Sequence, residues 1–503
     1  MPNLSPLDQS KIPTGIPGLD EILRGGLPPR RIYLIQGAPG SGKTTLALQF
    51  LLSGARAGEK VLYISLSETR DEVEEVARSH GWPLDDIEIV ELSAIDHQLS
   101  AQAQNTLFHA AEVELTETTE LLLDAVDRIK PTRVAFDSLS ELRLLSQTGL
   151  RYRRQILAFK QYFAGRNCTT LLLDDSVTNG ADAHVLSLAH GVISLEQLSP
   201  EYGAERRRLN IRKVRGSTYS GGYHDFVIGK GGLNIFPRLV AADHHRPFPH
   251  ETLPSGVDGL DELLGGGLDR GTSTLFSGPP GTGKSTLALK FALAAASRGQ
   301  RALLCTFDES LGTLLARARS LNLNLEEMME QGLIRAVQID PAELSPGELA
   351  SRLQRAVRDE DVKVVCLDSL NGYLHSMGEE RFLNLQLHEL LTYLNQQGIV
   401  TMLVVTPAGL LGSMQTPIDV TYLADTVITF RFFEADGSVH KAISVIKKRT
   451  GSHERTIREL TIAAEGIKVG PPLRGFRGIL TGTPTLPEKK RRRTARRKNE
   501  EGG

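Results

Sequence analysis

Short apolar runs separated by longer amphipathic stretches predict strands that alternate with helices. The runs at 32–35, 61–66 and 133–137 are apolar, and the last ends in the acid Asp137. Between the second and third runs, residues 70–80 repeat apolar positions with helical spacing and carry acidic residues in their first turns. This alternation predicts an α/β fold in which a mostly parallel sheet is flanked by helices on both faces.

The pattern continues downstream. Residues 96–129 are helix-like, with a polar first part and an end just before Pro131. Later apolar runs predict further strands at 169–175, 192–195, 209–213 and 226–228. The runs at 192–195 and 209–213 are expected to be antiparallel additions to the sheet.

The second half of the sequence repeats the first. Thr14 and Ser255 open similar Gly-rich segments 241 residues apart, and Glu68 and Glu309 are separated by the same step. Two copies are too few for a solenoid, so they predict two whole domains in tandem. The predicted parts are a lead-in (1–13), a first domain (14–239), a polar linker (240–252), a second domain (253–485) and a basic tail expected to be disordered (486–503).

Each half carries the phosphate-binding pattern Gly-x-x-x-x-Gly-Lys-Ser/Thr, at 37–44 and at 278–285. Each copy joins a strand-like run to a helix-like run, so its backbone N–H groups and helix dipole would favour a nucleoside triphosphate. Lys43 and Lys284 are expected to reach the β- and γ-phosphates. The predicted nucleotide-binding residues are Gly37, Gly40, Ser41, Gly42, Lys43, Thr44 and Thr45, with Gly278, Gly281, Thr282, Gly283, Lys284, Ser285 and Thr286.

Each half also places an aspartate followed by serine at the end of an apolar strand, at Asp137 and Asp368. With the hydroxyls of Thr44 and Ser285, these carboxylates are expected to hold Mg²⁺. An aspartate that merely caps a strand is the structural alternative.

A second set of acids follows the strand expected to lie next to the phosphate-binding strand. Glu68 in the first half, and Asp308 and Glu309 in the second, are candidate catalytic residues that orient or deprotonate the attacking water or hydroxyl. Exposed acids at strand ends are common, so a role in solvation alone is the alternative.

Basic turns follow a late strand in each half. Lys213 and Arg215 form one, and Lys447 and Arg449 form the other. Positive charge here would stabilise the departing γ-phosphate. A solvated hairpin tip would carry the same residues, and the recurrence in both halves favours the functional interpretation.

In this order, the motifs resemble the KaiC family of tandem RecA-like ATPases, which includes circadian-clock ATPase/kinases and many relatives outside clocks. The resemblance covers about residues 10–485. It is carried by Gly15-x-x-Gly18 and Gly256-x-x-Gly259, each followed by Leu-Asp-Glu, by both phosphate-binding loops and Asp-Ser pairs, by Glu68-Thr69 and Glu309-Ser310, and by both Lys-x-Arg turns.

The resemblance implies a homo-hexameric ring with two tiers, in which ATP binds between subunits. By the same resemblance, Lys213 and Arg215 would contact the first-tier nucleotide of an adjoining subunit, and Lys447 and Arg449 would contact the second-tier nucleotide.

The family also uses paired catalytic glutamates and phosphorylates an adjacent Ser-Thr pair in the second domain. Here Ser67 and Asp308 replace the first glutamate of each pair, which leaves the turnover of the first domain open. Thr421 keeps one acceptor hydroxyl and Tyr422 replaces the other. The resemblance therefore implies at most single-site autophosphorylation, at Thr421; an ordinary loop or helix residue is the alternative.

Composition narrows the classes of function that remain. The net charge of −2 gives no global attraction to nucleic acid or anionic membrane, and no apolar run approaches the length of a membrane span. Three widely spaced cysteines fit a reducing cytoplasm. The leading hypothesis is an ATP-hydrolysing oligomeric switch that uses Mg²⁺ and has autokinase potential. The alternatives are a RecA/RadA-type DNA-handling ATPase, which the basic tail favours, and a nucleotide-binding scaffold with little turnover; the tail is also a candidate docking site for a regulatory protein.

Overall fold

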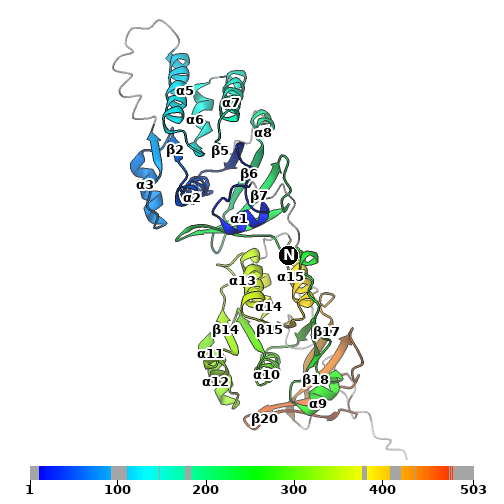
Figure 1. Ribbon diagram of the computed structural model, residues 1–503. Helices are drawn as coiled ribbons and strands as arrows, with labels where there is room; N and C mark the ends of the chain where they lie inside the picture. Colours follow the sequence, from blue (N-terminus) through cyan, green and yellow to red (C-terminus); the bar gives the residue numbers. More distant parts are fainter. Residues whose placement is uncertain are drawn as a thin grey trace, which may run out of the picture. The chain divides into compact units, whose positions relative to one another are not determined.

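Two compact units make up the chain, Met1–Arg238 and Leu239–Gly503, and each is built on its own nine-stranded sheet (Figure 1). The computed structural model describes residues 11–91, 110–146, 148–175, 183–376, 382–407, 421–435, 437–474, 476 and 478–479. The predicted tail at 486–503 and the first part of the helix-like stretch, 96–109, lie outside the described residues. No helix in the part of the chain described is long and apolar enough to cross a membrane.

The first sheet has the strand order β3-β2-β4-β5-β1-β6-β7-β8-β9. The strands from β3 to β6 pair in parallel, and those from β6 to β9 pair antiparallel. The strands are β1 (Ile32–Gly37), β2 (Val61–Ser65), β3 (Glu88–Glu91), β4 (Arg133–Asp137), β5 (Thr169–Asp175), β6 (Gly191–Leu198), β7 (Arg206–Val214), β8 (Tyr223–Gly229) and β9 (Gly232–Phe236).

Helices cover both faces of this sheet, as the alternation of elements predicted (Figure 1). Along β1, Tyr33 and Ile35 join the core under α1, α2 and α3, whereas Ile32 and Leu34 join the core under α5, α6 and α7. The helices are α1 (Pro17–Ile22), α2 (Lys43–Arg56), α3 (Arg70–Ser79), α5 (Ala110–Ile129), α6 (Leu139–Leu145), α7 (Gly149–Ala164) and α8 (Ala183–Leu188).

The second unit repeats this topology strand for strand, with the order β14-β13-β15-β16-β12-β17-β18-β19-β20. Its sheet strands are β12 (Thr272–Ser277), β13 (Arg301–Thr306), β14 (Ile334–Gln338), β15 (Val362–Asp368), β16 (Val400–Val405), β17 (Thr426–Ala435), β18 (Ser438–Lys448), β19 (Arg458–Ala463) and β20 (Gly466–Pro472). Its helices are α9 (Asp258–Leu264), α10 (Lys284–Ala296), α11 (Leu311–Ser320), α12 (Leu325–Glu330), α13 (Pro346–Asp359), α14 (Leu370–Ser376) and α15 (Leu383–Gln396).

The segment that joins the units contributes to the second unit. Leu239 and Ala241 belong to its core, and the 3₁₀ helix η3 (Ala241–His244) packs against α15. The backbone N–H of Ala241 donates to the Glu389 carboxylate at 3.0 Å. A short strand pair, β10 (Thr252–Leu253) with β11 (Leu268–Asp269), follows.

Two expectations about the sheet are wrong. The run at 192–195 lies in β6, which pairs in parallel with β1 from Tyr33↔Gly191 onward, so the antiparallel part starts only at β7. The strand before Glu68, β2, is not next to β1 either, because β4 and β5 lie between them. An apolar pattern predicts how buried a strand is, but it does not predict which strands it pairs with. The carboxyl ends of these parallel strands still meet at one edge, which is where the candidate site lies.

Candidate nucleotide sites

The phosphate-binding loops leave β1 and β12 at their carboxyl ends and open α2 and α10. Gly42 and Gly283, the residues just before the two helices, have φ of 101° and 102°, a backbone conformation that favours glycine. This conformation folds each loop back over the start of its helix, where the first N–H groups have no intrahelical partners. The geometry suits a bound polyphosphate in both units.

The lysines of the two loops have different surroundings. Lys43 Nζ donates to Gly37 O at 2.8 Å and lies 2.8 Å from Asp175 Oδ1 at the end of β5. Lys284 Nζ donates to the carbonyls of Gly278 and Pro279, at 2.7 and 2.9 Å. Burial lowers the pKa of Lys284 to about 8.

Asp175 was not predicted as a site residue, although the acidic end of the strand at 169–175 is visible in the sequence. Burial alone would raise its pKa, but the ion pair with Lys43 and a hydrogen bond from Ser140 outweigh burial and hold the pKa below its usual value. In the first unit, Asp175 pairs with Gly37 at the end of β1. The equivalent position beside the end of β12 in the second unit is Thr406, the residue after β16. The first site thus carries an acid at a position where the second has a threonine.

The strand-end aspartates lie against the loop hydroxyls. Thr44 Oγ1 donates to Asp137 Oδ2 at 2.9 Å, and the Tyr63 hydroxyl donates to the same oxygen at 2.6 Å. Ser285 hydrogen-bonds Asp368 in the second unit. Burial raises the pKa of both aspartates, partly offset by these hydrogen bonds. A hydroxyl beside a carboxylate at each loop is a donor set that fits Mg²⁺.

Glu68 comes after β2 at the same sheet edge. Its backbone N–H donates to Ser65 Oγ at 2.9 Å, which fixes the turn. Its Oε2 atom is buried and has no hydrogen-bond partner among the described residues. Burial raises the pKa of Glu68, and the nearby carboxylates of Asp137 and Glu72 raise it further. A half-buried carboxyl with a raised pKa at a phosphate site has the character of a general base.

The corresponding acids of the second unit are both engaged. Asp308 accepts a hydrogen bond from the Ser369 hydroxyl. Glu309 forms a two-point ion pair with Arg317 of α11, at 3.1 and 2.6 Å. Arg317 also donates to Thr286 Oγ1 at 3.2 Å. Arg317 was missed in the sequence, where the only signal is its position two helical turns after Glu309.

The basic turns lie away from the loops of their own units. Lys213 pairs in register with Val192, at the amino end of β6 and therefore at the amino end of β1. About three to five residues of strand, or about 10–17 Å, separate this turn from the carboxyl end of β1. Lys213 donates to Leu186 O, and Arg215 donates to Ser187 O at 2.7 Å.

The second unit repeats this placement. Lys447 pairs with Val427, near the amino end of β17. Its Nζ donates to the carbonyls of Thr421 and Ala424, at 3.0 and 2.6 Å. Arg449 lies 3.3 Å from the Asp425 carboxylate. Thr421 is exposed and follows residues 408–420, which lie outside the description.

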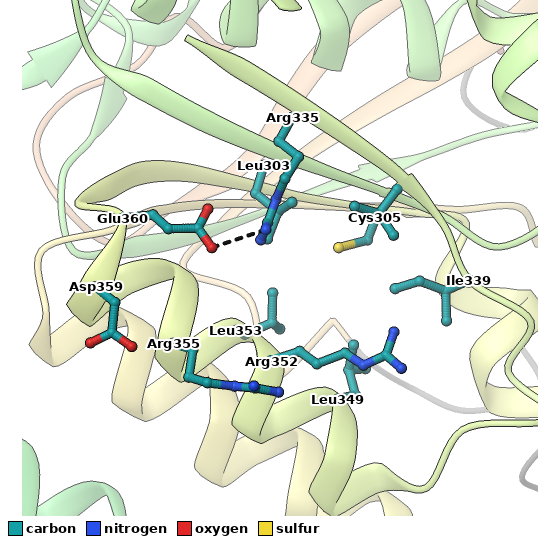
Figure 2. Close-up of a pocket in the computed structure, with 11 residues that line it drawn as sticks. Leu303, Cys305, Arg335, Ile339, Leu349, Arg352, Leu353, Arg355, Asp359 and Glu360 are labelled. Carbon is teal, nitrogen blue, oxygen red and sulfur yellow. Dashed lines mark ion pairs between the residues drawn. The ribbon is translucent and has the colours of Figure 1, made fainter. Parts of the chain in front are cut away.

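A cavity in the second unit is separate from its phosphate-binding loop. It has a volume of about 320 Å³ and lies between β13, β14 and α13, with the side chain of Cys305 on one wall (Figure 2). Its arginines are largely paired with acids, Arg335 with Glu360 at 2.9 Å and Arg352 with Glu348 at 2.7 Å. Within the described residues, no group of three or more His, Cys, Asp or Glu side chains could hold a metal ion.

Two phosphate-binding loops on sheets of this topology define a tandem RecA-like P-loop ATPase. The family model described as "ATPase: KaiC" matches residues 12–240 and 253–474, and the chain belongs to the KaiC ATPase family. The circadian clock oscillator protein KaiC of Thermostichus vulcanus is 30% identical over 498 residues, which cover 96% of this chain and 94% of the relative. KaiC of Synechococcus elongatus is 27% identical over 486 residues, 95% and 92% of the two chains. KaiC 1 of Synechocystis is 28% identical over 485 residues, 94% and 92%.

Proposed function

We propose that this protein hydrolyses ATP at two sites per chain, that each site is completed by an adjoining subunit, and that the assembly acts as a switch. The observation that carries the hydrolytic part is the convergence of lysine, hydroxyl and carboxylates on one sheet edge. Lys43 and Thr44 from the start of α2, Asp137 from the end of β4 and Glu68 after β2 meet there. Lys284, Ser285, Asp368 and Glu309 repeat the set.

The proposed division of roles follows from chemistry. Lys43 and Lys284 bind the β- and γ-phosphates, and the loop backbone orients them. Thr44 with Asp137, and Ser285 with Asp368, would hold Mg²⁺, which neutralises charge on the phosphates. Glu68 and Glu309, with Asp308 beside the latter, would orient and deprotonate the attacking water.

Single and double substitutions of the loop lysines test hydrolysis. Lys43→Ala and Lys284→Ala should each remove part of the phosphate release, and the double variant should remove all of it. Lys230→Ala changes an exposed lysine in the β8–β9 turn and serves as the control. Turnover by the double variant equal to that of the unmodified protein would contradict the assignment.

Self-assembly is proposed from where the cations lie. Lys213 and Arg215 are at the amino end of β1, whereas the loop that binds nucleotide is at its carboxyl end. A cation in this place cannot contact the nucleotide of its own domain, but it can project from one subunit into the site of the next. A head-to-tail interface of this kind gives a ring when the rotation between subunits closes, and a filament when it does not. We propose an ATP-dependent ring, with a hexamer as the expected size.

Mixing two inactive variants tests the shared site. In a Lys284→Ala background, Lys43→Ala and Arg215→Ala should each be inactive alone. Mixed in equal amounts before ATP is added, they should regain activity, because about a quarter of the interfaces then combine an intact loop with an intact arginine. Arg212→Ala, an exposed neighbour on β7, is the control and should not lose activity. No recovery, together with a monomeric mass in ATP, would overturn the proposal.

A phosphotransfer role is proposed for Thr421. Its carbonyl accepts a hydrogen bond from Lys447, so this exposed residue lies beside a cation assigned to the adjoining site. A γ-phosphate held by Lys447 would therefore be near this acceptor. Intact-mass analysis after incubation with ATP should show one added phosphate, which Thr421→Ala should abolish. An unmodified mass in the wild type would restrict the function to hydrolysis.

A further inference from the structure

The two candidate sites hold their catalytic carboxylates in different ways. Arg317 meets Glu309 with two N–H groups, Nε to Oε1 at 3.1 Å and Nη2 to Oε2 at 2.6 Å. Both side chains are mostly buried, with 22% and 23% of their surfaces exposed. A forked, partly buried pair of this kind is stronger and more directional than a pair in solvent.

The same arginine also contacts the phosphate-binding element. Its Nη1 donates to Thr286 Oγ1 at 3.2 Å, in the first turn of α10 and one residue after Ser285. Arg317 therefore ties the carboxylate of Glu309 to the start of the helix that binds phosphate.

Among the described residues of the first unit, Glu68 has no such arginine contact. The residue 241 positions before Arg317 is Val76, which cannot form an ion pair. Glu68, the counterpart of Glu309, keeps a buried Oε2 atom without a hydrogen-bond partner among the residues described. The internal duplication thus offers the same site with and without the arginine.

We infer that Arg317 is a positioning residue that restrains Glu309 and slows ATP hydrolysis at the second site. To take a proton from water, Glu309 must direct an oxygen away from the guanidinium, and loss of the forked pair adds to the barrier. The inference rests on the proposed function, because it assigns Glu309 the role of base.

The test uses the full chain with Lys43→Ala, so that only the second site turns over. Arg317→Val, which installs the residue found in the first unit, should raise kcat by about 10-fold, a fraction of what a positioned general base contributes. KM for ATP should change little, because the loop and its lysine are untouched. Arg317→Lys, which keeps the charge but loses the fork, should give a smaller increase. Arg319→Ala removes an exposed arginine of α11 that pairs with Glu326 and should leave kcat unchanged.

The reciprocal variant keeps the test decisive should Arg317→Val fail to fold. In a Lys284→Ala background, Val76→Arg should lower kcat at the first site. An unchanged or lower kcat in a folded, ATP-binding Arg317→Val protein would overturn the inference. So would an unaffected kcat in Val76→Arg. Should Glu309→Gln have no effect on a parent that turns over, the proposed role of Glu309 as base fails instead, which separates the two outcomes.

Discussion

At the scale of single residues, the duplicated loops differ in what surrounds their lysines. Lys43 is paired with Asp175, whereas the hydrogen bonds of Lys284 within the described residues go to backbone carbonyls, and burial lowers its pKa to about 8. A phosphate must displace Asp175 from the first lysine, and at high pH it must recruit a proton to the second. The two sites should therefore respond differently to mutation and to pH.

Asp175→Thr, which copies Thr406 of the second unit, should tighten ATP binding at the first site. Removing the competing carboxylate frees Lys43 for phosphate, and the loss of one partly exposed pair should be worth about 3- to 5-fold in affinity. Calorimetric titration in a Lys284→Ala background measures the change. Weaker binding in Mg²⁺ would instead indicate that Asp175 helps to hold the metal ion.

The second site should lose ATP affinity as the pH rises. A polyanion favours the charged form of Lys284, so binding raises its pKa again from about 8. Affinity is then fully present below pH 8 and falls above it by up to about 10-fold per pH unit. Binding at pH 8.5 should take up a proton, which titrations in two buffers of different ionisation enthalpy detect. A Lys43→Ala background isolates the site, and a flat affinity from pH 7 to 9.5 would contradict this assignment.

At the scale of elements, the helix starts after the catalytic acids are built differently in the two units. Thr69 caps α3 with a reciprocal pair of hydrogen bonds, Thr69 N to Glu72 Oε2 at 2.7 Å and Glu72 N to Thr69 Oγ1 at 3.3 Å. Ser310 Oγ accepts from Thr313 N at 3.1 Å and hydrogen-bonds Thr313 Oγ1 at 2.9 Å, but residue 313 is a threonine and carries no carboxylate like that of Glu72. Since Glu68 directly precedes Thr69, the cap also fixes the backbone that carries the acid.

Thr69→Ala should loosen the start of α3 without unfolding the domain. The lost cap should speed hydrogen exchange of the first α3 amides by about 5-fold, and kcat at the first site should fall with it. Ser310→Ala is the matched change in the second unit, where the bonds of Ser310 Oγ with Thr313 are lost, and it should speed exchange of the first α11 amides by a similar factor. Unchanged exchange at the start of α3 in Thr69→Ala would contradict the role of the cap.

The sequence predicted the strands and helices better than it predicted which strands pair and which side chains meet. The strand at 133–137 and the helix at 70–80 were predicted from apolar periodicity, and the structure has β4 and α3 there. Strand order was not accessible, because the insertion of β4 and β5 between β2 and β1 depends on crossovers between distant segments. The contacts of Lys43 with Asp175 and of Glu309 with Arg317 were missed because they depend on that order and on rotamers across a helix.

At the scale of the whole molecule, each unit has its own pair of cores, one on each face of its sheet. The core residues around each sheet come from the same unit as the sheet, and the division between the units falls between Arg238 and Leu239. Folding of one unit should therefore not require the other.

Fragments 1–238 and 239–503, produced separately, should each fold and bind one ATP. Cooperative thermal unfolding and a titration stoichiometry of about one per fragment are the expected results. Lys43→Ala and Lys284→Ala should abolish binding in the respective fragment while leaving its melting curve intact. An unfolded first fragment would show that the second unit supplies part of its stability.

The placement of Lys213 and Arg215 at the amino end of β1 has a consequence for how activity depends on protein concentration. Under the proposed sharing of sites between subunits, a protomer on its own binds ATP in an incomplete site. Dilution should then abolish hydrolysis, and specific activity should rise with protein concentration. Expression level would then control the rate of ATP hydrolysis: a cell that makes twice as much of this chain would hydrolyse ATP more than twice as fast.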